Sequence, residues 1–184
     1  MMQPSLRILR LICCLAVVSL AVTGATQDTD DSRLLLDHLA GDWVLKGVLG
    51  KKTAVHDVHA EWVLNHEYIR LHETSREKKQ NGEPAYEAII FISWDAKAQQ
   101  YACLWLDNTE GGGLSAEGIA HAKPQEFSIP FEWVQAGAVT LRNTFSYNAR
   151  LDTWRWAIDN IRKGKAEPFG DVTLTRAAPG LSHK

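Results

Sequence analysis

Four carboxylates stand within or at the end of otherwise apolar stretches, and they are the first residues that could do chemistry: Glu73, Glu87, Asp107 and Glu117. A carboxylate that faces a protein interior is costly unless a cation or several hydrogen-bond donors meet it. Arg70 lies in the strand-like run that precedes the run of Glu87, and antiparallel neighbours would bring the two together. We therefore expect an internal Arg70–Glu87 ion pair, which either fixes strand register or anchors the polar end of a ligand.

Four histidines fall close together in the sequence and raise the question of a metal site: His56, His59, His66 and His72. On a strand, residues three positions apart point to opposite faces, so the His56-x-x-His59 spacing makes no ligand pair there. A metal would need His72 to meet one of them from the next strand, with a carboxylate joining. A haem would need one axial histidine in an apolar pocket, and nothing distinguishes one for that role. We predict no metal and no cofactor, and retain His72 as a polar contact for a ligand.

No motif for a catalytic nucleophile or a phosphate-binding loop is present. The chain lacks G-x-S-x-G, and Ser115 follows glycines but enters a strand-like run rather than a helix. The run Gly111 to Gly113 lacks the Lys-Ser/Thr of a phosphate loop, and residues 108–113 are better interpreted as a flap at the mouth of the fold. Paired carboxylates serve glycoside hydrolysis, but the spacing places no pair at the required separation of about 5 to 9 Å. No catalytic residue is predicted.

Tryptophan supplies the strongest binding signal, because all seven tryptophans lie after residue 25. We expect at least half of the aromatic side chains to fill a core, and Trp105 and Trp156 to line a pocket near its open end. In an extended chain Asp107 shares a face with Trp105, and Asn160 shares one with Trp156. The predicted ligand-binding set is Arg70, His72, Glu87, Trp105, Asp107, Trp156 and Asn160.

The elements that must position these side chains are short runs rich in Val, Ile, Thr and aromatic residues, separated by Gly, Asn, Asp, Pro or Lys clusters. Such runs, recurring about every 10 to 14 residues, indicate an all-β sandwich or barrel. Short connections imply antiparallel neighbours. A short helix, Arg33 to Leu39, precedes them. The ten predicted strands are Asp42–Leu49, Ala54–Leu64, Tyr68–Arg76, Tyr86–Trp94, Gln100–Leu106, Leu114–Ala122, Glu126–Val134, Ala138–Tyr147, Thr153–Ile161 and Gly170–Thr175.

The first 25 residues have the composition of a secretory signal peptide. Arg7 and Arg10 precede an apolar run of about a dozen residues, and small residues end at Ala25. That run is too short to cross a hydrocarbon core of about 30 Å. We expect cleavage after Ala25, export to the periplasm or the exterior, and no stable membrane span. Residues 26–32 then form a flexible lead-in, residues 33–176 one domain, and residues 177–184 a C-terminal tail.

The chain after residue 25 is mildly acidic. Loss of the two arginines lowers the number of Lys and Arg from 20 to 18, while Asp and Glu stay at 22, which leaves a net charge of −4. An acidic domain without a basic stripe argues against nucleic acid as a partner. Cys103 is the one cysteine that remains, so no internal disulfide is expected, and its apolar neighbours predict a buried thiol.

Several different short motifs are spread along residues 33–176, and together they indicate a family. They are Leu39-Ala40-Gly41-Asp42-Trp43, Glu61-Trp62-Val63-Leu64, Tyr68-Ile69-Arg70, Ser93-Trp94-Asp95, Tyr101 with Leu104-Trp105-Leu106-Asp107, and Gly111 to Gly113. Together they resemble a bacterial family of exported, lipocalin-like (calycin-type) β-barrels of unknown function. The resemblance implies an antiparallel barrel of about 8–10 strands rather than a sandwich. In such a barrel Trp43 would pack under the core as a structural residue.

These observations predict an exported protein that binds a small, partly apolar molecule, such as a lipid or an aromatic metabolite, and carries no cofactor. An enzyme that uses carboxylate or histidine acid–base groups in the same pocket is the main alternative. A structural or partner-binding module is a third.

Overall fold

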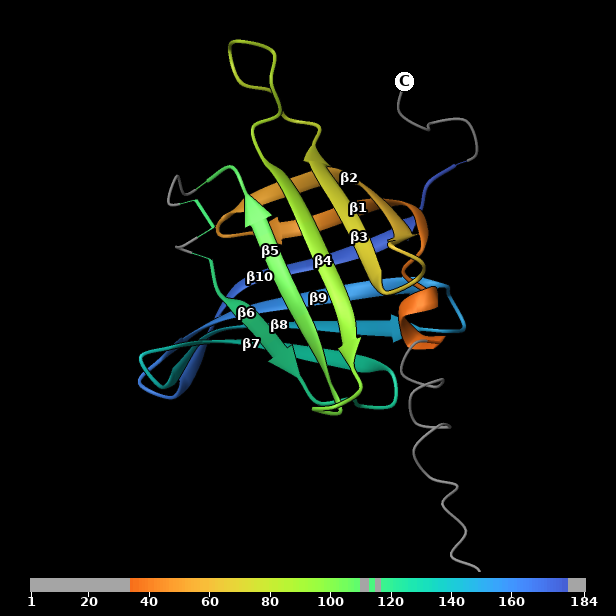
Figure 1. Cartoon of the computed structure of the whole chain (residues 1–184). Coiled ribbons are helices and arrows are strands. Elements are labelled where there is room, and N and C mark those ends of the chain that lie inside the picture. Colours follow the sequence, from red (N-terminus) through yellow and green to blue (C-terminus); the bar gives the residue numbers. More distant parts are fainter. Residues whose placement is uncertain (1–33, 110–112, 115–116, 179–184) are drawn as a thin grey trace, which may run out of the picture.

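The computed structural model describes residues 34–109, 113–114 and 117–178, and these form a closed antiparallel β-barrel (Figure 1). Each strand pairs with its neighbours in the sequence, and β1 pairs with β10 to close the ring. The predicted antiparallel barrel of about 8–10 strands is confirmed, with ten. The strands are β1 Gly41–Leu49, β2 Lys52–Val63, β3 Tyr68–Ser75, β4 Glu87–Asp95, β5 Gln100–Asp107, β6 Ile119–Ala122, β7 Ser128–Gln135, β8 Ala138–Asn148, β9 Thr153–Arg162 and β10 Lys165–Arg176.

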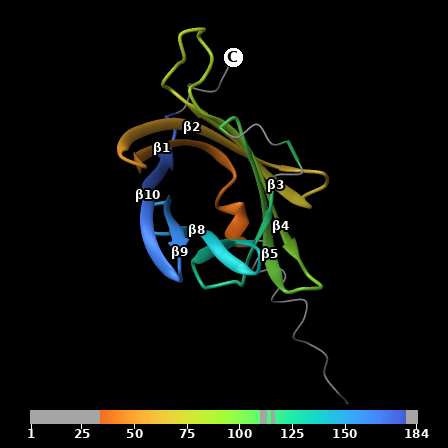
Figure 2. The same ribbon diagram turned by 90° about the vertical axis from the view of Figure 1, so that its left-hand side faces the viewer.

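The up-and-down order gives the barrel two different ends. The β2–β3, β4–β5, β6–β7 and β8–β9 connections lie at one end, together with the helical turn at residues 34–37. Figure 2 shows the ring of strands with this helical turn inside its outline. We call the end that carries the helical turn the closed end. The β1–β2, β3–β4, β5–β6, β7–β8 and β9–β10 connections lie at the other end, which we call the mouth.

Three tryptophan side chains fasten the helical turn to the barrel wall. Each indole N–H donates a hydrogen bond to the segment 37–39: Trp62 to Asp37 Oδ1 at 2.7 Å, Trp43 to the Leu39 carbonyl at 2.7 Å, and Trp154 to the His38 carbonyl at 3.1 Å. Leu36 and Leu39, both 0% exposed, pack beneath them. The structural role predicted for Trp43 is therefore confirmed.

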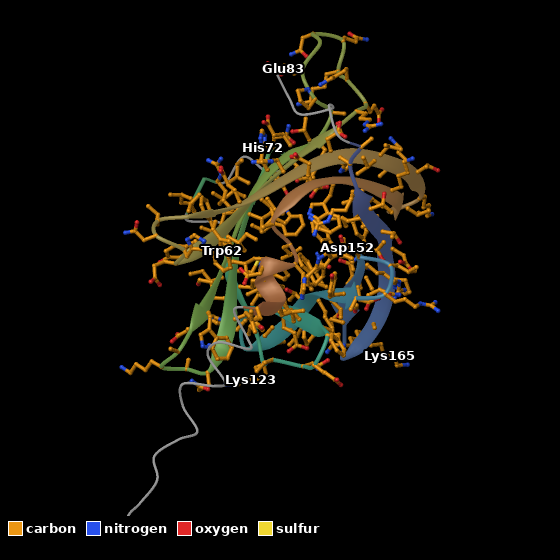
Figure 3. The ribbon with its side chains drawn as sticks, turned by 90° about the vertical axis from the view of Figure 1, so that its right-hand side faces the viewer. Trp62, His72, Glu83, Lys123, Asp152 and Lys165 are labelled. Carbon is orange, nitrogen blue, oxygen red and sulfur yellow. The ribbon has the colours of Figure 1, made fainter. Side chains whose placement is uncertain are left out.

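Arg176 joins the last strand to the first at the closed end. Its guanidinium carbon lies 3.7 Å from the centroid of the Trp43 ring, and its Nη1 donates to the Ala40 carbonyl at 2.6 Å. Its Nε donates to Asp152 Oδ2 at 2.8 Å, a bond that holds the pKa of the Asp152 carboxyl below its ordinary value. Trp62 and Asp152 lie to either side of the helical turn in Figure 3. The closed end is thus sealed by packing and by charge-assisted hydrogen bonds.

Burial of the inward side chains changes along the barrel axis. Most of those in the closed-end half are 0–2% exposed and form one core: Trp43, Leu45, Val58, Ala60, Ile69, Leu71, Ile90, Ile92, Tyr101, Cys103, Ile129, Phe131, Phe145, Trp154 and Leu174. Trp62, Trp94 and Tyr147, nearest the closed end, are half-buried and pack against this core. Towards the mouth many inward side chains are only half-buried: Leu49, Trp105, Asp107, Trp133, Leu141, Ile158 and Asn160. Polar side chains are among the half-buried inward residues towards the mouth, namely Asp107 and Asn160.

Eight strands lie within two residues of their predicted bounds at each end, and two differ by more. β6 is four residues long and begins at Ile119 rather than Leu114, and only His121 and Glu132 register it with β7. β10 begins at Lys165 rather than Gly170, because Lys163 and Gly164 both adopt positive φ and make a tight two-residue turn. Pro168 disfavours a regular strand, but a register shift between Pro168 and Gly170 accommodates it in the β9–β10 pairing.

The predicted signal peptide (residues 1–25) and lead-in (26–32) lie outside the described residues, as do parts of the predicted flap and C-terminal tail. Within the described ranges, no helix is both long enough and apolar enough to cross a membrane.

Candidate functional site

The predicted internal Arg70–Glu87 ion pair is wrong. Strand alternation turns Ile69 and Leu71 inward, so Arg70 and His72 point outward from β3. Arg70 pairs with Glu61 on the outer surface, and His72 Nε2 lies 2.7 Å from Glu87 Oε1. All four of these side chains are more than two-fifths exposed. These cross-strand pairs on the outer face give Arg70, His72 and Glu87 no access to the barrel interior.

The acid that β3 turns inward is Glu73, and its partner is His56 on β2. Glu73 is 2% exposed and His56 is 6% exposed. In the β2–β3 register Glu73 lies opposite Val58, which makes His56 its diagonal neighbour on the same face. His56 Nδ1 and Glu73 Oε1 are 2.5 Å apart. A carboxyl and an imidazole therefore share a short hydrogen bond inside the mouth half of the barrel.

The protonation of Glu73 follows from its surroundings. Burial raises the pKa of its carboxyl, the contact with His56 lowers it in part, and the charge of Asp107 adds to the rise. Its second oxygen, Oε2, has no hydrogen-bond partner within the described chain. A buried carboxyl with one free oxygen is able to accept a hydrogen bond from a guest or to exchange a proton with it.

Aromatic side chains extend this pair across the barrel. The Tyr86 ring stacks on His56 with centroids 5.4 Å apart, and the Tyr86 hydroxyl accepts a hydrogen bond from Trp105 Nε1 at 2.9 Å. The Trp105 ring meets the Trp156 ring edge to face, with centroids 5.9 Å apart and an interplanar angle of 74°. Burial is the main cause of a raised pKa at Tyr86, and the charges of Glu73 and Asp107 contribute. The cluster thus runs from β2 to β9 without a break.

Four of the predicted site residues face the interior. Trp105 and Trp156 touch each other from β5 and β9, and Asp107 lies close enough to influence both Glu73 and Tyr86. Asn160 lies on the inward face of β9, four residues nearer the mouth than Trp156. The two tryptophans thus face the interior, whereas a pocket beside them and a role in binding stay predictions.

Three further inward atoms lack hydrogen-bond partners within the described ranges: Asn143 Oδ1 on β8, Trp156 Nε1 on β9 and, nearer the closed end, Trp94 Nε1 on β4. Asn143 is 3% exposed and Trp156 is 1% exposed. A buried polar group without a partner costs about 1–3 kcal/mol, so such groups often meet a ligand or water. Sequence reasoning missed Asn143, Tyr86 and the His56–Glu73 pair. The inward position of Glu73 could have been predicted, because Glu73 follows Ile69 and Leu71 at every second position of the same strand.

Other kinds of site have less support. Among the described residues, no group of three or more His, Cys, Asp or Glu side chains is placed to hold a metal ion. Two hollows of about 620 Å³ and 240 Å³ open on the outer surface. The larger includes Phe127, Leu151 and Arg155, and the smaller includes Phe91 and Ile119. Neither contains a residue of the interior cluster or of the predicted ligand-binding set.

The chain matches no protein-family model, and no curated protein is significantly similar to it. The barrel fold is therefore supported by the structure itself, and the resemblance to lipocalin-like proteins stays a prediction.

Proposed function

We propose that this protein is exported and binds a small, partly apolar molecule in the mouth half of its barrel. The observation that carries the proposal is the contrast between the two ends. One end is sealed by the helical turn and the core above it, whereas inward aromatic and polar side chains at the mouth remain partly exposed. Binding sites typically combine aromatic walls with a few polar groups in this way.

The expected affinity follows from the area that a guest could bury. A ligand that buries about 200 Å² of apolar surface gains roughly 5 kcal/mol, before the cost of association is subtracted. Apolar contact alone therefore supports only weak binding. The unpaired atoms of Glu73, Asn143 and Trp156 supply the additional polar contacts that a tighter complex needs.

Native mass spectrometry of the protein as purified, followed by solvent extraction, tests the binding proposal. A stoichiometric adduct should be present in the wild type and should weaken in Trp105→Ala, which removes a partly exposed wall. Leu106→Ala, on the outer face of the same strand, is the matched control and should keep the adduct. A protein that carries no adduct and takes up no small apolar probe would argue against binding.

Export has its own test. The apolar segment before Ala25 predicts removal of the first 25 residues. N-terminal sequencing of the protein recovered outside the cytoplasm should begin at Thr26 or within one or two residues of it. Recovery of the uncleaved chain in the cytoplasm alone would contradict export without bearing on binding.

An enzyme is the second candidate, and the His56–Glu73 contact favours it. A buried carboxyl of raised pKa beside an imidazole is a common acid–base arrangement. Glu73→Gln keeps the shape of the side chain and removes its proton exchange. An enzyme variant of this kind would hold its substrate unchanged over time, whereas the wild type would release an altered molecule. If both proteins return the same compound, the binding proposal stands alone.

A further inference from the structure

The buried and half-buried inward side chains of the mouth half carry acids but no base stronger than histidine, within the described part of the chain. The ionisable groups there are His56, Glu73, Tyr86 and Asp107. The arginines of the surrounding strands point outward and are held by acids: Arg70 by Glu61, Arg76 by Asp57, Arg142 by Glu132 and Arg155 by Asp171. Arg162, at the rim, is exposed and pairs with Glu167. The interior therefore offers two carboxyls and no lysine or arginine to neutralise them. Each already uses one oxygen within the chain: Glu73 Oε1 contacts His56, and Asp107 Oδ1 accepts hydrogen bonds from the Thr109 backbone N–H and hydroxyl.

The unpaired buried atoms favour a guest that donates hydrogen bonds. Glu73 Oε2 and Asn143 Oδ1 are acceptors, and both belong to side chains that are at least nine-tenths buried. A purely apolar guest would leave these acceptors unsatisfied, and an anionic guest would also face repulsion from Glu73 and Asp107. Trp156 Nε1 is the one unpaired inward donor of the mouth half among the described residues. Acceptors thus outnumber donors where a guest would lie.

The aromatic side chains beside these acceptors suit a cation. Trp105 and Trp156 stand at 74° to each other and make two adjoining walls, and Tyr86 is hydrogen-bonded to Trp105. The face of an aromatic ring carries partial negative charge and attracts a cation within about 6 Å of its centroid. Phe145 stacks on one face of Trp156, with ring centroids 4.3 Å apart and an interplanar angle of 15°. The half-buried Trp105 ring is therefore the one better placed to offer a face to a cation.

We propose that the guest is an organic cation, in which a primary or substituted ammonium group is attached to an apolar or aromatic body. Its charged end lies at Glu73 and Asp107, beside the Trp105–Trp156 corner, and its body extends towards the mouth. This inference rests on the proposed binding function and names the chemical class of the ligand.

Three probes that share one body and differ in end-group charge test the inference: 4-phenylbutylammonium, 4-phenylbutan-1-ol and 4-phenylbutyrate. Isothermal titration calorimetry at pH 7.5 should give the cation an affinity about tenfold or more above that of the alcohol, with the anion weakest. Glu73→Gln should abolish the preference for the cation and change alcohol binding little. Glu61→Gln removes the same charge from the outer face of β2 and should leave the preference intact.

A proton readout separates a direct contact from a structural effect. Burial raises the pKa of the Glu73 carboxyl, and a nearby ammonium group would favour its ionised form. Binding of 4-phenylbutylammonium should therefore release protons, which calorimetry detects in buffers of different ionisation enthalpy. Glu73→Gln should release fewer. If this variant does not fold, Asp107→Asn, at a half-buried position, should weaken cation binding in the same direction.

The outcomes distinguish this inference from the function on which it rests. A wild type that binds the alcohol or the carboxylate as tightly as the ammonium compound overturns the cation inference and leaves small-molecule binding in place. A preference for the cation that survives in both Glu73→Gln and Asp107→Asn overturns the assignment of the site. If no probe binds and the purified protein also carries no adduct, both the inference and the proposed function fail.

Discussion

The seal at the closed end predicts a large and position-specific loss of stability when Leu36 is truncated. Leu36 is 0% exposed beneath the hydrogen bonds that tie the helical turn to Trp43, Trp62 and Trp154. Replacing a fully buried leucine by alanine costs about 2–5 kcal/mol, because the transfer free energy of the lost methyl groups adds to the cost of the remaining cavity. For a chain of this size, each kcal/mol lowers the unfolding midpoint by about 2–4 °C.

Leu36→Ala should therefore lower the midpoint by about 4–20 °C, measured by circular dichroism on the chain without residues 1–25. Leu34→Ala is the matched control, because Leu34 lies in the same turn and is 54% exposed. Alanine also has the higher helix propensity, so the control should remain within about 0.5 kcal/mol of the wild type. Equal losses in the two variants, or a loss below about 1 kcal/mol for Leu36→Ala, would refute the reasoning that the turn is part of the core.

Three further outcomes follow from single residues. The folded-state pKa of Glu73 is raised by burial, so the wild type should lose stability relative to Glu73→Gln as pH rises above about 4.3, the ordinary pKa of an unfolded glutamate. Urea unfolding across pH 4 to 8 measures this, and an unfolding free energy of the wild type minus that of the variant that stays constant or increases with rising pH would contradict it. Gly47→Ala should destabilise strongly, since its Cβ would lie 2.2 Å from the Asp171 carbonyl oxygen, whereas Gly118→Ala makes only an ordinary 3.6 Å contact; equal midpoints would count against the close β1–β10 approach. Cys103, 0% exposed and with a thiol pKa raised by burial, should react with a thiol reagent only after unfolding, and rapid reaction of the native protein would show an open wall.

Strand composition made most of the fold predictable. Runs such as Ile89 to Ile92 and Trp154 to Ile158 are rich in β-formers and bounded by turn residues, so their existence and order followed from local chemistry. The start of β10 did not follow, because Pro168 argues against a strand unless a register shift absorbs it. That shift depends on pairing with β9, which no local pattern contains.

About half of the candidate site was predicted from the sequence. Trp105 and Asp107 were placed together because they share one strand, and a period of two fixes their common face. Arg70 and Glu87 were instead joined by charge and by neighbouring strands, without asking which face β3 turns inward. Alternation of Ile69 and Leu71 decides that question and selects Glu73. Its partner His56 is a diagonal neighbour, which depends on the β2–β3 register.

The short β6 leaves the barrel wall with a seam. Four residue pairs join it to β5 and a single pair joins it to β7, whereas every other junction in the described ring carries six or more. Backbone amides of a wall open where the fewest hydrogen bonds must break together. Hydrogen exchange should therefore be fastest along this junction, which lies beside the β5–β6 connection at the rim. A guest too bulky for the mouth would therefore enter most easily between β6 and β7, where a single residue pair joins the wall.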